Sequence, residues 1–179
     1  MALIREWRPV IVGGNGPAIS TSLSEDEAAK LAELAAGKTV MEIGSAYGYS
    51  AVVMAVAGGQ VVAIDPHSWL PSFGPMTENL AAYGVEDRVT IIMDGAENAV
   101  PMLEDRGLRF DLVWIDGDHS QQAVERDVRL ALTVLAPGGV LACHDYDEIS
   151  CPGVRPGLEA MVGNPHELIG TLAIYRGLR

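Results

Sequence analysis

The chain has 179 residues, of which 49% are apolar and 20% are charged, a composition typical of one globular domain. Twenty-four acidic residues against 12 basic ones give a formal net charge of −12 at pH 7. This charge would repel a nucleic-acid backbone or an anionic membrane surface, so we expect neither as a partner. The two cysteines, Cys143 and Cys151, are too few for a disulfide framework. Because no apolar run suits a signal peptide or a membrane span, we expect a cytoplasmic protein.

The first twenty residues differ in character from the rest. They contain the glycine-rich stretch 13–17, which predicts a separate N-terminal arm or flap over residues 1–20, although plain disorder explains it equally well. Residues 21–179 then form a single domain. Its first helix begins at a capping box, in which Ser24 and Glu27 satisfy each other's backbone amides, and Gly37 can end that helix.

Short, nearly continuous apolar runs alternate with helical segments along the remainder of the chain. This rhythm predicts an α/β fold with a Rossmann-like, doubly wound and mostly parallel sheet that has helices on both faces. The predicted parallel strands are residues 39–43, 60–64, 88–93, 110–115 and 138–143. A helical repeat of Val124, Val128, Ala131 and Leu135 follows the fourth strand. The tail predicts a short antiparallel edge, in which 172–175 is the surer strand.

A glycine loop joins the first strand to an apolar helix over residues 51–57. Glu42 precedes the loop, and Gly44 and Gly48 lie four residues apart within it. Glycines at the carboxyl end of a parallel sheet let a ligand approach the backbone. A nicotinamide-dependent oxidoreductase would have the spacing G-x-G-x-x-G and would gain nothing from a carboxylate there. A ligand with an ammonium and a sulfonium group would gain from it, so the loop favours such a ligand.

This pattern resembles the first motif of the class I S-adenosylmethionine-dependent methyltransferases, an acidic residue followed by x, Gly, three residues and Gly. The resemblance extends over residues 18–177 and implies S-adenosylmethionine as the cofactor. It implies that Asp65 holds the ribose hydroxyls and that Asp94 lies near the adenine, although Asp94 before a glycine also suits an ordinary turn. The expected cofactor-binding residues are Glu42, Gly44, Ser45, Tyr47, Gly48, Ser50, Asp65, Asp94, Ala96 and Asp116.

Acidic residues and histidines follow the fourth and fifth strands. Asp116, Asp118 and His119 end the fourth, and His144 and Asp145 end the fifth, so neighbouring strands should bring them together. The cluster is similar to that of metal-assisted small-molecule O-methyltransferases of the catechol and macrolide-sugar types. That similarity implies that Asp116, His144 and Asp145 hold a divalent cation, Mg²⁺ or Mn²⁺. A histidine in place of the usual carboxylate also admits Fe²⁺, Zn²⁺ or no metal.

The catalytic base is expected among these histidines. Similar sugar methyltransferases use a histidine at the position of His119, and His144 is the second catalytic candidate; His119 could instead merely cap the next helix. His67 is a weaker candidate. It begins a long loop, 67–76, whose residues Trp69, Leu70 and Phe73 could wall the acceptor pocket or form the contact of a homodimer.

The sequence therefore predicts an enzyme that transfers a methyl group from S-adenosylmethionine to a hydroxyl oxygen of a small molecule. The alternative is a cofactor-binding module without activity that serves as a partner subunit.

Overall fold

The computed structural model describes residues 7–13, 16–68 and 70–178. A two-stranded antiparallel ribbon of β1 (Arg8–Val10) and β2 (Ile19–Thr21) precedes a seven-stranded sheet of order β5-β4-β3-β6-β7-β9-β8. The elements that build and cover this sheet are α1 (Glu25–Ala35), β3 (Thr39–Ile43), α2 (Tyr49–Val56), β4 (Gln60–Ile64), α3 (Phe73–Tyr83), a 3₁₀ turn (Glu86–Arg88), β5 (Val89–Ile92), α4 (Ala96–Asp105), β6 (Phe110–Ile115), α5 (Gln121–Val134), β7 (Leu135–Cys143), α6 (Val154–Val162), β8 (Glu167–Ile169) and β9 (Leu172–Arg176).

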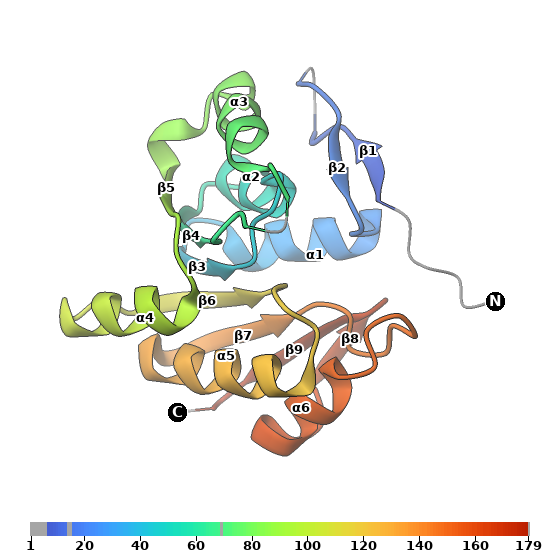
Figure 1. The fold of residues 1–179 in the computed structure, drawn as a ribbon, viewed down its shortest axis with the longest axis vertical. Coiled ribbons are helices and arrows are strands. Elements are labelled where there is room, and N and C mark those ends of the chain that lie inside the picture. Colours follow the sequence, from blue (N-terminus) through green and yellow to red (C-terminus); the bar gives the residue numbers. More distant parts are fainter. Residues whose placement is uncertain (1–6, 14–15, 69, 179) are drawn as a thin grey trace.

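The helices cover the sheet in two groups of three. Helices α1, α2 and α3 pack on one face and α4, α5 and α6 on the other, as Figure 1 shows. Alternate strand residues serve the two layers: Val40 and Trp114 belong to the first core, and Met41 and Val113 to the second. Strands buried on both faces are apolar nearly throughout, which is why the sequence shows them as continuous apolar runs.

Strand register sets the position of the site. Strands β5, β4, β3, β6 and β7 are parallel to one another. Strand β9 pairs antiparallel with β7, and β8 pairs antiparallel with β9. Ile43 pairs with both Ile64 and Ile115, and Ile115 pairs with Cys143. The residues that follow these four therefore meet at one edge of the sheet. The predicted Rossmann-like fold with its antiparallel C-terminal edge is confirmed.

Three of the five predicted parallel strands, 39–43, 60–64 and 110–115, have the predicted bounds. The third strand begins at Val89 because residues 86–88 form the 3₁₀ turn. The fifth begins at Leu135 rather than at residue 138. Leu135 is thus a strand residue, and the segment Pro137 to Gly139 lies inside β7, where the register with β6 shifts, as at a bulge.

The predicted loop 67–76 is too long. Helix α3 already begins at Phe73, and Pro75 lies in its first turn, where a missing N–H costs the helix nothing. Trp69 lies outside the described residues. The helix predicted at 51–57 begins earlier, at Tyr49.

The connection between β1 and β2 is hydrogen-bonded to Tyr83 of α3. The Tyr83 hydroxyl accepts a hydrogen bond from the Val12 amide at 2.9 Å and donates one to the Pro17 carbonyl at 2.7 Å. Ile19 is buried in the first core. Whether residues 1–20 act as an arm or flap stays a prediction. Within the described part of the chain, no helix combines the length and the apolar character needed to cross a bilayer.

Candidate active site

A cavity of about 760 Å³ opens at the carboxyl ends of the parallel strands. This volume is in the range of sites that hold a cofactor or a small molecule. Its wall includes residues that follow each of four strands: Gly44, Ser45 and Tyr47 after β3, Asp65 after β4, Asp116 and His119 after β6, and Asp145 and Cys151 after β7.

The loop after β3 fits so closely against β6 that its glycine cannot be replaced without movement. Gly44 has a φ of +89°, and a Cβ atom there would collide with the Asp116 carbonyl. Asp65 holds the same loop from the other side: its Oδ2 accepts the Ala46 amide at 2.8 Å, and its Oδ1 accepts the His67 amide at 2.7 Å. Ala46 itself has a φ of +42°, a conformation that residues other than glycine rarely adopt. The loop is therefore fixed in shape against the cavity.

Glu42 lies beneath this loop and is fully buried. Its Oε1 accepts a short hydrogen bond from the Ser50 hydroxyl, whereas its Oε2 has no hydrogen-bond partner among the described residues. Burial raises the pKa of Glu42 to about 8, with the charges of Asp116 and Asp65 adding to the effect and the Ser50 bond opposing it. At neutral pH the carboxyl group is therefore mostly protonated, and it links β3 to α2.

The cavity includes most of the predicted cofactor residues. Those that line it are Gly44, Ser45, Tyr47, Ser50, Asp65, Ala96 and Asp116. Glu42, Gly48 and Asp94 do not line it. Asp94 is exposed and accepts hydrogen bonds from the Gly95 amide and the Asn98 side chain at the start of α4, as a turn residue would. The roles of all ten predicted residues in cofactor binding stay predictions.

The ends of β6 and β7 bring Asp116, His144 and Asp145 together, as the sequence indicates. His144 is fully buried, and its Nδ1 lies 3.4 Å from an Asp116 oxygen and 3.3 Å from an Asp145 oxygen. Burial alone would lower the pKa of His144, but the neighbouring carboxylates raise it well above its usual value. Burial would likewise raise the pKa of Asp116, but the charges and hydrogen bonds of His144 and His119 hold it below its usual range.

Glu27 is a member of this cluster that the sequence analysis missed. Its Oε2 lies 3.5 Å from His144 Nε2 and also accepts the Ser24 amide of the capping box at 2.7 Å. Its Oε1 accepts the Thr171 amide at 2.7 Å from the turn between β8 and β9. Burial would raise the pKa of Glu27, but the hydrogen bonds with His144, Ser24 and Thr171 hold it far below its usual value. The capping box gives this residue a sufficient local explanation, so no sequence signal pointed to its second role.

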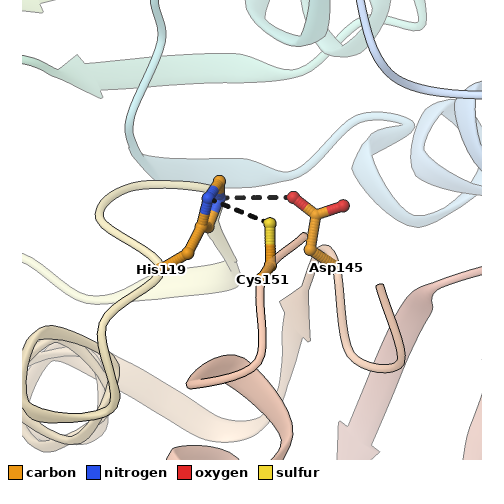
Figure 2. Close-up of side chains that lie close together, drawn as sticks. All are labelled: His119, Asp145 and Cys151. Carbon is orange, nitrogen blue, oxygen red and sulfur yellow. Dashed lines mark hydrogen bonds and ion pairs between the residues drawn. The ribbon is translucent and has the colours of Figure 1, made fainter. Parts of the chain in front are cut away.

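His119 stands at the mouth of the cluster, with a side chain that is 40% exposed. Its Nε2 lies 3.2 Å from Asp145 Oδ2 and 3.6 Å from Asp116 Oδ1, and its Nδ1 lies 3.2 Å from Cys151 Sγ. Figure 2 shows the imidazole ring facing both Asp145 and Cys151. The hydrogen bond with Asp116 raises the pKa of His119, although burial opposes the rise.

The cap of α5 is a neighbour of His119. Ser120 is the N-cap residue, and its hydroxyl accepts the Ala123 amide. His67 points elsewhere: its Nδ1 lies 2.7 Å from the Ser72 hydroxyl, and the residue does not line the cavity.

The donor set Asp116, His144 and Asp145 fits a divalent cation. One ligand atom of each residue lies within 4.8 Å of the others. Glu27 lies beside Nε2 of His144, so the other ring nitrogen, Nδ1, faces the carboxylates of Asp116 and Asp145. In metal sites an outer carboxylate commonly orients a metal-binding histidine in this way. A protonated His144 would also place a positive charge between Asp116 and Asp145. The two carboxylates can therefore be neutralised either by a bound cation or by a protonated His144.

Comparisons with known proteins bear on the family and the fold of the chain. A methyltransferase-domain family model matches residues 41–146, more than half of the chain. No curated protein matches the sequence significantly.

Solved structures share the fold over most of the chain. Cofactor-bound Rv0187 from MTB is 25% identical, with a TM-score of 0.68, over 80% of this chain and 70% of that one. The O-methyltransferase TomG from Streptomyces achromogenes, involved in tomaymycin synthesis and solved with SAM, is 26% identical, with a TM-score of 0.64, over 79% and 70% of the two chains. An O-methyltransferase from Bacillus cereus, solved with SAH, is 24% identical, with a TM-score of 0.67, over 80% and 71%, and shows the same fold.

Proposed function

This chain belongs to the methyltransferase-domain family, of the class I S-adenosylmethionine-dependent type, and we propose that it methylates a hydroxyl oxygen of a small molecule. One observation carries the proposal: a single cavity joins the glycine loop and Asp65 to the acid and histidine cluster of β6 and β7. Such a cavity can hold a methyl donor at one end and an acceptor at the other. Alignment of donor carbon and acceptor oxygen is the main contribution a methyltransferase site makes.

At the donor end, the loop residues Gly44 to Tyr47 form the wall beside Asp65. Both Asp65 oxygens accept backbone amides, and a carboxylate oxygen has a second lone pair that can accept a ribose hydroxyl. The cofactors in the TomG and Bacillus cereus structures, SAM and SAH, support S-adenosylmethionine for this chain.

At the acceptor end, His119 is the proposed general base. Its side chain is 40% exposed and lines the cavity, whereas the other histidine of the cluster, His144, is enclosed. Asp116 and Asp145 stabilise the imidazolium ring that forms when His119 takes the hydroxyl proton. His144 orients the two carboxylates and is therefore a positioning residue in this scheme.

Asp116, His144 and Asp145 would hold a divalent cation, Mg²⁺ or Mn²⁺. When bound, such an ion makes a nearby hydroxyl more acidic. The three residues, with Glu27 behind them, also keep the floor of the acceptor end rigid and exclude water from it.

The test is transfer of isotopically labelled methyl groups from S-adenosylmethionine to a panel of hydroxylated small molecules, including catechols and sugars. The wild type and His166→Ala, which removes an exposed histidine beside β8, should give labelled ether products. His119→Ala should form them about 10²–10⁴-fold more slowly. Label that appears on nitrogen or carbon acceptors, or no transfer to any hydroxyl, would contradict the proposal.

A further inference from the structure

The loop that follows β7 brings Cys151, a thiol that the proposed methyl transfer does not use, to His119 and Asp145. Asp145 lies two residues after the end of β7 and Cys151 six residues further on, and both line the cavity beside His119. The loop folds back on itself through hydrogen bonds from the Glu148 amide to the Asp145 carbonyl at 3.2 Å and from the Cys151 amide to the Glu148 carbonyl at 2.9 Å. These bonds bring the Cys151 thiol to the His119 ring.

We infer that His119, Asp145 and Cys151 form a binding site for a thiophilic divalent cation of the zinc class. One ligand atom of each residue, nitrogen, oxygen and sulfur, lies within 4.8 Å of the other two. Cys151 Sγ lies 3.2 Å from His119 Nδ1. Zinc–ligand bonds of about 2.0–2.3 Å place the donors of a tetrahedral site about 3.3–3.6 Å apart, so small side-chain shifts suffice to close the set around an ion.

The chemistry of the donors separates this set from that of Asp116 and His144. Thiolate and imidazole ligands select zinc-class ions, whereas Mg²⁺ prefers oxygen. As the metal–sulfur bond forms, the S–H bond of Cys151 breaks and its proton leaves to solvent. If His119 binds through Nδ1, Asp145 Oδ2, which lies 3.2 Å from Nε2, has to turn toward the ion, and the Nε2–H is then left facing Asp116 at 3.6 Å, which can orient the ring from behind.

The two sets share one carboxylate. Asp145 Oδ1 lies 3.3 Å from His144 Nδ1, and Asp145 Oδ2 lies 3.2 Å from His119 Nε2. Asp145 has a φ of +58°, which is uncommon for a residue with a side chain and turns the chain sharply at this point. An ion bound to His119 and Cys151 makes His119 unavailable as the general base and also occupies the carboxylate of Asp145. It should therefore inhibit methyl transfer reversibly, and this consequence alone rests on the proposed function.

The test uses Co²⁺ as a spectroscopic substitute for zinc in chelator-treated, reduced protein without cofactor or acceptor. The wild type should develop a thiolate-to-cobalt charge-transfer band in the near ultraviolet, which Zn²⁺ removes and excess Mg²⁺ does not. Cys151→Ser and Cys151→Ala should lack the band. Cys143→Ala is the matched control, because Cys143 is buried in β7, does not line the cavity and should leave the band in place.

Zinc affinity gives a second measurement by competition with a chromophoric chelator. Removal of a residue that only supports a metal ligand weakens metal binding by up to about 100-fold. Because Cys151→Ala removes a ligand itself, it should weaken Zn²⁺ binding by at least about 100-fold. No band in the wild type, a band that persists in Cys151→Ala, or equal zinc affinity of the two proteins would overturn the inference. Binding of S-adenosylhomocysteine, measured separately, decides the cofactor assignment, so failure of one is distinguishable from failure of the other.

Discussion

The carboxyl group of Glu42 is fully buried, and Ser50 is the hydrogen-bond donor that the described residues provide to it. Its pKa is about 8 in the fold against an ordinary value of 4.5, so between these values the folded chain binds more protons than the unfolded chain. The free energy of unfolding should therefore fall as pH rises from about 4.5 to about 8.

The substitution Glu42→Gln should remove the part of this dependence that Glu42 contributes and leave the part that comes from His119 and His144, whose pKa values are also raised. At about 1.4 kcal/mol per pKa unit, the wild type should lose at most about 5 kcal/mol across the window relative to the variant. Urea denaturation at several pH values measures it, with Glu86→Gln, an exposed position, as the control that should follow the wild type. A Glu42→Gln protein with the same pH slope as the wild type would show that the carboxyl group is not the cause.

His119 is the residue on which the proposed chemistry depends most. His119→Ala should lower kcat by about 10²–10⁴-fold and leave the affinity for S-adenosylhomocysteine almost unchanged, because proton transfer matters only in the transition state. A base must be neutral before it accepts a proton. The wild-type rate should therefore rise with pH through a pKa that Asp116 raises above the ordinary value of 6.5. Steady-state kinetics and calorimetry together check both parts, and an unchanged kcat would leave the cluster a structural feature.

The connection from β3 to α2 is the element whose backbone the site requires most strictly. Gly44→Ala combines a left-handed φ with a collision against the Asp116 carbonyl, whereas Gly107 has a φ of +74° and open space around it. The left-handed conformation alone costs a residue with a side chain about 1–2 kcal/mol. Gly107→Ala should lose about that much stability and keep cofactor affinity, and Gly44→Ala should lose more and bind the cofactor poorly.

Chemical denaturation and calorimetric titration of the two glycine variants measure these quantities. Equal losses of stability and equal cofactor affinity in both variants would mean that the loop does not need its close approach to β6.

The residues that follow β6 and β7 lead to a prediction about the metal dependence of methyl transfer. If Asp116, His144 and Asp145 hold a divalent cation, methyl transfer should fall in excess chelator and return with added Mg²⁺ or Mn²⁺. Rate measurements on chelator-treated and metal-restored enzyme test this. Full activity in excess chelator would instead assign the positive charge between the carboxylates to protonated His144, whose pKa is raised well above its usual value.

The strands could be predicted because burial on both faces leaves a continuous apolar run, as in 39–43 and 110–115. Boundaries failed where a local signal was ambiguous. Pro75 suggests a loop but fits the first turn of α3, and the fifth strand, predicted from residue 138, begins at Leu135 because the segment from Pro137 lies within β7 as a bulge. Likewise Asp116 and Asp145 were predictable because they end adjacent strands.

Two members of the site were beyond the sequence analysis for a physical reason. Glu27 reaches His144 and Thr171 only because the N-terminus of α1 lies beside the end of β7 and the turn between β8 and β9, and a capping box already explained the residue locally. Cys151 reaches His119 through the folded loop after β7, which has no periodic pattern to read. Contacts of this kind depend on tertiary packing rather than on residue spacing.

At the scale of the whole molecule, one sheet edge collects groups from α1, β3, β4, β6 and β7 around a single cavity. The acidic surplus of the chain, a net charge of −12, suits a cationic sulfonium donor better than a phosphate-rich ligand. A homodimer stays a prediction, because the residue Trp69, which contributed to it, lies outside the described part of the chain.

The central claim is that this cavity binds S-adenosylmethionine with Asp65 at the donor end and His119 at the acceptor end. Calorimetric titration with S-adenosylhomocysteine of the wild type, Asp65→Ala and His119→Ala tests it most directly. We predict micromolar binding by the wild type and His119→Ala. Asp65→Ala should bind more weakly by roughly 1.5–3 kcal/mol, the scale of charge-assisted hydrogen bonds. No binding by the wild type, or equal affinity of Asp65→Ala and the wild type, would contradict the account.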